Sequence, residues 1–112
     1  MLLMMQFDEL GYLRSRVEAR CASLGIGEER TDAMLDAGFG TSAKATETRL
    51  RIVDEMLMLV TDVFGVGRGA DWLRHHGETF GGATPLDLAT GGLSGVRRVR
   101  DHLRILHDVL AD

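Results

Sequence analysis

The feature that most constrains this chain is a very short helix confined between two pairs of glycines. It begins at Thr84-Pro85-Leu86-Asp87, where Thr is a good N-cap, Pro suits the first helical position, and Asp stands where a capping box has its carboxylate. It ends at Gly91-Gly92, and Phe80-Gly81-Gly82 forms the turn before it. The sequence therefore predicts a helix over Pro85–Thr90 inside a module of alternating helices and glycine turns.

The segment after Gly92 has the clearest helical periodicity in the chain. Its apolar residues recur at steps of three and four, which predicts a helix from Ser94 or Gly95 to Leu110 with one packing face. This seam consists of Val96, Val99, Leu103, Leu106 and Leu110, with Ile105 and Val109 widening it. Arginines occupy the other faces, so this helix is locally basic although the chain has a net charge of -4.

Four apolar patterns predict helices upstream, each followed by a glycine turn or run. The predicted ranges are residues 7–24, residues 28–37, Ala43–Phe64 with Thr41 or Ser42 as its N-cap, and residues 70–76. Two adjacent apolar stripes make the third helix central and largely buried. The inward residues of the first two helices are Leu10, Leu13, Val17, Cys21 and Leu24, then Ala33, Met34 and Leu35.

No run alternates apolar and polar residues over the length of a strand, so the predicted fold is all-α. We expect a compact bundle of about five helices with glycine-rich turns, divided into residues 1–42 and 43–112. The N-terminal helical pair would be a degenerate helix-turn-helix or a dimerisation element. A single cysteine excludes an internal disulfide, and no segment is long enough to span a bilayer, so we expect a cytoplasmic protein with no membrane contact.

No group of side chains has the spacing of a catalytic or metal site. His75 and His76 are adjacent and would point about 100° apart on a helix, while Cys21 lies on an apolar helix face. The glycine run over residues 65–69 lacks the Lys-Ser/Thr of a phosphate loop and is predicted to be a turn between helices. We therefore expect no enzyme activity, no metal and no cofactor.

An ordered string of unlike residues runs through the second half of the chain. It consists of Ala70, Trp72-Leu73, Phe80-Gly81-Gly82, Thr84-Pro85-Leu86-Asp87-Leu88, Thr90, Val96, Val99 and Leu103. In this order and spacing, from about Leu50 onward, the string resembles the toxin-binding domain of Xre/MbcA/ParS-type antitoxins. That family often has Pro-Asn shortly after Trp-Leu, where this chain has His75-His76. The motif residues expected to be structural are Trp72, Phe80, Gly81, Gly82, Thr84, Pro85 and Asp87.

The resemblance implies an antitoxin-like protein over residues 43–112 that needs no catalytic residue. Its partner would be a cognate RES-domain toxin, which consumes NAD or transfers ADP-ribose, and it would act by covering the toxin's active-site cleft. Antitoxins of this kind often form homodimers, for which the exposed parts of the stripes over residues 10–24 and 50–64 are the expected surface. In this family the C-terminal end of the domain lies near the toxin's cleft. The expected partner-binding residues are Arg97, Arg100, Arg104, His107 and Asp112.

Other interpretations of the same features are open at this point. The arginines of the last helix are equally typical of a solvated face that balances Asp101 and Asp108. The alternative function is a DNA-binding transcriptional regulator that uses the N-terminal helical pair. Against it, the second helix carries Glu28, Glu29 and Asp32, where a DNA reader needs Lys or Arg. A third hypothesis is the same domain recruited to a protein partner that is not a toxin.

Overall fold

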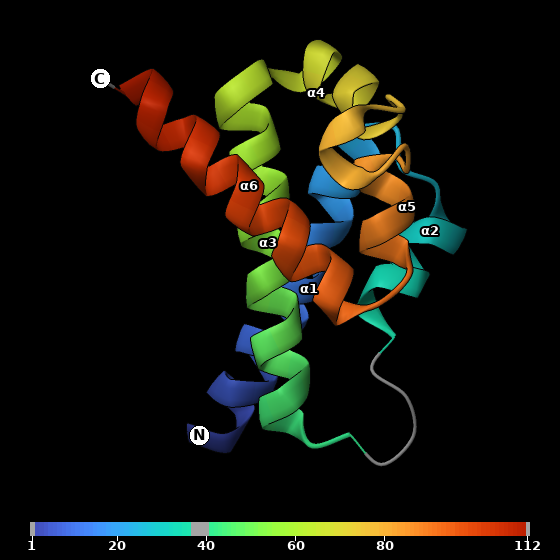
Figure 1. The fold of residues 1–112 in the computed structure, drawn as a ribbon. Coiled ribbons are helices and arrows are strands. Elements are labelled where there is room, and N and C mark those ends of the chain that lie inside the picture. The colour runs from blue at the N-terminus through green and yellow to red at the C-terminus, as the bar shows by residue number, and fades with distance from the viewer. Residues whose placement is uncertain (1, 37–40, 112) are drawn as a thin grey trace.

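The structure is a computed structural model that describes residues 2–36 and 41–111, with side chains from residue 9 onward. Its elements are α1 (Leu2–Ser23), α2 (Glu28–Leu35), α3 (Ala43–Phe64), α4 (Val66–Leu73), the 3-10 helix η1 (Glu78–Phe80), α5 (Pro85–Thr90) and α6 (Leu93–Ala111). Figure 1 shows α3 as the long central helix, with α6 crossing it on one side and α1 on another. All regular elements in the described residues are helical, which confirms the predicted all-α bundle.

Helix α3 is central because it is apolar around most of its circumference. Both predicted stripes are buried over its middle, including Val53, Met56, Leu57 and Val60, none of which has measurable exposure. Each such side chain contributes about 1.5–3 kcal/mol when it is removed from water. The helix begins as predicted, with the Ser42 hydroxyl accepting a hydrogen bond from the Ala45 amide at 3.1 Å.

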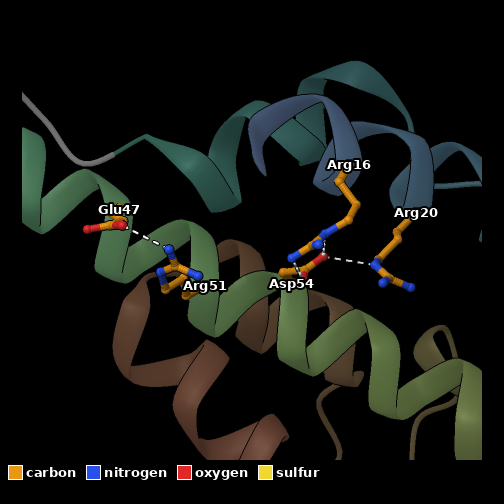
Figure 2. A network of polar contacts seen from close by, with 5 residues as sticks. All are labelled: Arg16, Arg20, Glu47, Arg51 and Asp54. Carbon is orange, nitrogen blue, oxygen red and sulfur yellow. Dashed lines mark hydrogen bonds and ion pairs between the residues drawn. The ribbon is translucent and has the colours of Figure 1, made fainter. Parts of the chain in front are cut away.

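A buried carboxylate fixes α1 against α3. The Asp54 side chain accepts a hydrogen bond from Arg16 Nη2 at 2.7 Å and another from Arg20 Nε at 2.8 Å (Figure 2). Arg16 and Arg20 are one helical turn apart, so both reach the same carboxylate from α1. Asp54 is only 7% exposed, and these two charge-assisted contacts compensate its burial. The contact therefore holds α1 at one position along α3.

The helix over residues 70–76 was predicted four residues too far along the chain. Helix α4 begins at Val66, directly after Gly65, and ends at Leu73, so the glycine run is mostly helical. The reason is packing: a Cβ on Gly69 would lie 2.7 Å from Val60 Cγ1. Gly69 is thus present because α4 approaches α3 closely, and not because the chain turns there.

Helix α5 and its cap confirm the prediction for Pro85–Thr90. Thr84 Oγ1 accepts a hydrogen bond from the Asp87 amide at 3.0 Å. The following helix crosses α5 at very close range, since a Cβ on Gly95 would lie 1.8 Å from the Leu88 carbonyl oxygen. Only glycine fits this crossing, which the sequence pattern did not reveal.

The N-terminal helices share a core with the rest of the chain. Their inward residues from Leu13 to Leu24 are buried as predicted, whereas Ala33 of α2 is exposed, contrary to the prediction. Arg74 donates to the carbonyl oxygens of Leu24 and Gly25, at 3.3 and 2.6 Å, so it ties α1 to the end of α4. The predicted end of the second helix at residue 37, and the turn over residues 38–40, lie outside the described residues.

Substitution of Gly95 tests the α5–α6 crossing. Gly95→Ala should lower the free energy of unfolding by about 3 kcal/mol, because the added methyl collides with backbone that cannot rotate away. The matched control is Gly67→Ala within α4, where a Cβ meets nothing within 4 Å and alanine favours the helix. Thermal denaturation should show a fall of about 10 °C or more for the first variant and no fall for the second. Equal melting temperatures would contradict the crossing.

Candidate partner-binding surface

Trp72 joins α4 to α6 through an aromatic cluster. Its ring stacks on Phe64, with centroids 5.0 Å apart, and on His102 of α6, with centroids 6.4 Å apart and an interplanar angle of 5°. Phe80 meets Trp72 edge-on, with centroids 6.4 Å apart. Trp72 is half-buried and packs against the core, so it anchors the helices while part of it reaches the surface.

The glycine turn after η1 places Phe80 in this cluster. Gly81 and Gly82 both have positive φ, at 66° and 90°, which explains the paired glycines. Phe80 is buried, and the guanidinium of Arg98 lies 5.7 Å from the centroid of its ring. His76 Nδ1 lies 2.9 Å from the carbonyl oxygen of Gly82, so this histidine helps to hold the turn.

The end of α6 exposes apolar side chains that were predicted to widen or extend the packing seam. Val96, Val99 and Leu103 are buried as expected, but Ile105, Val109 and Leu110 are 63%, 67% and 66% exposed. The prediction was wrong for these three, because the last turns of α6 diverge from α3, as Figure 1 shows, and leave these side chains uncovered. We call Ile105, Val109 and Leu110 the apolar end of α6. A shallow cavity of about 150 Å³ adjoins it, lined by Asp62, Val63, His107, Leu110 and Ala111.

The expected basic rim of α6 is partly occupied by ion pairs within the chain. Arg104 donates to Glu55 of α3 through Nε and Nη2, at 2.8 and 2.9 Å, and this contact raises the pKa of its guanidinium. Arg100 lies 3.8 Å from Glu55 and donates to Asp101 at 2.9 Å. Arg97 is exposed, His107 lines the cavity described above, and Asp112 lies outside the described residues. We expected Asp101 and Asp108 to balance these arginines. Asp101 accepts hydrogen bonds from Arg100, whereas Arg104 donates to Glu55 and not to Asp108.

Residues 59–106 match the family model of the antitoxin Xre/MbcA/ParS C-terminal toxin-binding domain. The match extends from the second half of α3 to Leu106 and includes the whole aromatic cluster, so the resemblance seen in the motif residues is confirmed. Neither the curated proteins nor the solved structures give a significant match.

The segment that matches the family model, residues 59–106, contributes to a second, mixed-charge cavity of about 500 Å³. Its lining comes from the α1–α2 turn, α2, the end of α4 and the start of α5, and includes Arg30, Arg74 and Asp87. Arg30 Nη1 donates to Asp87 at 3.1 Å, and the guanidinium of Arg74 is used by backbone carbonyls. These polar groups satisfy one another, and their contacts connect the N-terminal helices to residues 59–106.

In the described part of the chain we considered two kinds of reactive site, the Cys21 thiol and a group of metal ligands. Burial raises the pKa of the Cys21 thiol, although a hydrogen bond with Thr31 acts in the opposite direction, so this thiol is a poor nucleophile. Within the ranges that the structure describes, no three His, Cys, Asp or Glu side chains gather in a way that could hold a metal. The described helices also include none with the length and apolar character needed to cross a membrane.

The cap of α5 should make stability depend on pH through Asp87. Hydrogen bonds with Thr84 and then Arg30 lower the pKa of this carboxyl below its ordinary value. Its stabilising contribution is therefore present above the unfolded pKa of about 3.9 and is lost as pH falls through the lower folded pKa. Because the side chain is half exposed, we expect Asp87→Asn to cost only about 0.5 kcal/mol at neutral pH, and less near pH 2.

The measurement is the melting temperature of both proteins at the two pH values. Asp108→Asn, an exposed position on α6, is the control for loss of one negative charge. A difference between wild type and Asp87→Asn that is the same at both pH values would contradict the assigned role of the carboxylate.

Proposed function

We propose that this protein is an antitoxin that binds a toxin through the apolar end of α6 and the surface beside it. We further propose that the toxin is a RES-domain enzyme that consumes NAD or transfers ADP-ribose. The observation that carries the proposal is a cluster of exposed apolar side chains at the end of, and just beyond, a segment that matches a toxin-binding domain. Inhibition by covering a cleft requires a complementary surface and no catalytic group in this chain.

The distribution of apolar surface supports α6 as the contact. The exposed large apolar side chains of the described residues are Tyr12, Met58, Val66, Ile105, Val109 and Leu110. Half of these lie on the last two turns of α6, and such gathered exposure is typical of interaction sites. Aliphatic anchors surrounded by charged side chains are the arrangement in which a few residues supply most of the binding free energy.

The homodimer remains a proposal, but the surface predicted for it is used inside the chain. Leu13, Val17, Cys21 and Leu24 of α1 and Leu50, Val53, Leu57 and Val60 of α3 are all buried. The two stripes thus supply the α1–α3 core. Among the described residues, they offer a second copy the partly buried Leu10, Val63 and Phe64.

DNA binding is the alternative function, and the geometry of α2 gives it no support. Glu28, Glu29 and Asp32 are exposed on this helix, and α2 and α5 are joined by the Arg30–Asp87 ion pair. Acidic side chains facing a phosphate backbone oppose the counterion release that drives most of the affinity for DNA.

Two exposed residues of α6 test the proposal directly. Ile105→Glu combined with Val109→Glu should leave the fold intact, since both side chains are exposed, and should weaken toxin binding by about 100-fold. Each single variant, Ile105→Glu and Val109→Glu, is compared with the matched control Tyr12→Glu, which places the same single charge at an equally exposed apolar position on α1. The partner to use is the product of the neighbouring gene in the source genome, co-expressed and purified with each variant.

Three measurements give the result: co-purification, calorimetric affinity, and loss of NAD with and without this chain. Emission from Trp72, the only tryptophan in the chain, should also change on binding, because it lies beneath α6. A complex without NAD chemistry would replace the RES-domain toxin by another partner. No complex, together with salt-sensitive binding to promoter DNA, would favour the alternative.

A further inference from the structure

Glu55 is the acidic group that the arginines of α6 contact on α3. Arg104 meets it with two parallel hydrogen bonds of 2.8 and 2.9 Å, and Arg100 lies 3.8 Å away. The Glu55 side chain is 30% exposed and that of Arg104 is 51% exposed, so the pair lies at the surface. It lies on the exposed side of the α3–α6 contact, where an incoming protein could reach it.

Such a pair can be exchanged at low cost. Exposed ion pairs contribute little to stability, because water solvates both groups well when they separate. A guanidinium nevertheless forms a bidentate hydrogen bond through Nε and Nη2 with only one carboxylate at a time. While Glu55 accepts both hydrogen bonds from Arg104, a second carboxylate forms only a weaker, less directed contact with this guanidinium.

We propose that Glu55 is an internal competitor for acidic protein surfaces. In the free chain it occupies Arg104 and partly neutralises Arg100, and an acidic side chain at the rim of the partner's cleft takes its place in the complex. This inference rests on the proposed function for the identity of the partner as a toxin. The competition itself concerns only the acidic character of the surface that α6 meets.

The competition has a consequence for selectivity. With Arg100 and Arg104 paired internally, this side of α6 attracts acidic molecules only weakly, and binding there depends on the apolar end to bring a partner close enough for exchange. An acidic polymer without an apolar patch gains little, whereas a partner that covers Ile105 and Val109 gains both contacts.

Isosteric removal of the Glu55 charge provides the test. Glu55→Gln should bind the toxin about two- to fivefold more tightly than wild type, because the competing carboxylate is gone. The matched control is Glu47→Gln, which breaks the 2.9 Å pair with Arg51 on the same helix and changes the net charge by the same one unit. Glu47 lies eight residues from Glu55, or about 12 Å along α3, and should leave toxin affinity unchanged.

A fluorescent hexaglutamate peptide, titrated at low salt by anisotropy, supplies a probe that does not depend on the toxin. Glu55→Gln should bind this peptide more tightly than wild type by a similar factor. Adding Arg104→Gln to Glu55→Gln should abolish the gain, because the released guanidinium is then absent.

The direction in which Glu55→Gln changes the affinity for the toxin distinguishes competition from a structural role of Glu55. Competition predicts a slightly lower melting temperature together with tighter binding in Glu55→Gln. Weaker toxin binding by Glu55→Gln would overturn the proposal, since Glu55 would then hold the arginines in the orientation that the partner needs. Unchanged binding to the hexaglutamate peptide would overturn it as well. If wild type forms no complex with the toxin, the proposed function fails, and the peptide titration alone decides the role of Glu55.

Discussion

The burial of α3 over most of its circumference is the constraint on which the rest of the structure depends. Its partners must cover different sides, and consecutive residues Asp54 and Glu55 show the result, because they point about 100° apart and face different helices. Each receives two arginines: Arg16 and Arg20 from α1 for Asp54, and Arg100 and Arg104 from α6 for Glu55. The difference lies in burial. Asp54 is nearly inaccessible, so removal of either side of its contact would leave an uncompensated charge, whereas Glu55 can exchange with a partner.

The second constraint is the close approach of helices within residues 59–106. Gly69 lets α4 pack on Val60, and Gly95 lets α6 start directly on the backbone of α5. These contacts leave little room for α6 to rotate or slide. The stacking of Trp72 on His102 then fixes α6 from a second side. A helix held in this way presents its outer face in one arrangement, which reduces the entropy lost when a partner binds.

Helical periodicity and capping chemistry predicted most of the elements, because both are local. Ala43–Phe64 and Pro85–Thr90 have the bounds expected from the Ser42 and Thr84 caps. The errors arose where tertiary contacts decide. Glycine in α4 is typical of a break in a local pattern, but Gly69 allows close helix packing. Ile105 and Val109 continue an apolar pattern, but both side chains are exposed in the folded chain. The partner of Arg104 is 49 residues away in sequence, so no local pattern could identify it.

The exposed apolar end of α6 is costly for a free chain, because gathered aliphatic surface promotes association with any apolar surface. That cost is expected only where binding needs it, and here it falls on the last turns of a helix whose earlier turns are fully packed. The same helix keeps Arg100 and Arg104 paired with Glu55 on the neighbouring side. In the proposed complex, affinity and selectivity would therefore be separated along one element. The apolar end would supply contact area, and the arginines that pair with Glu55 would add a charge contact only for a partner already in place.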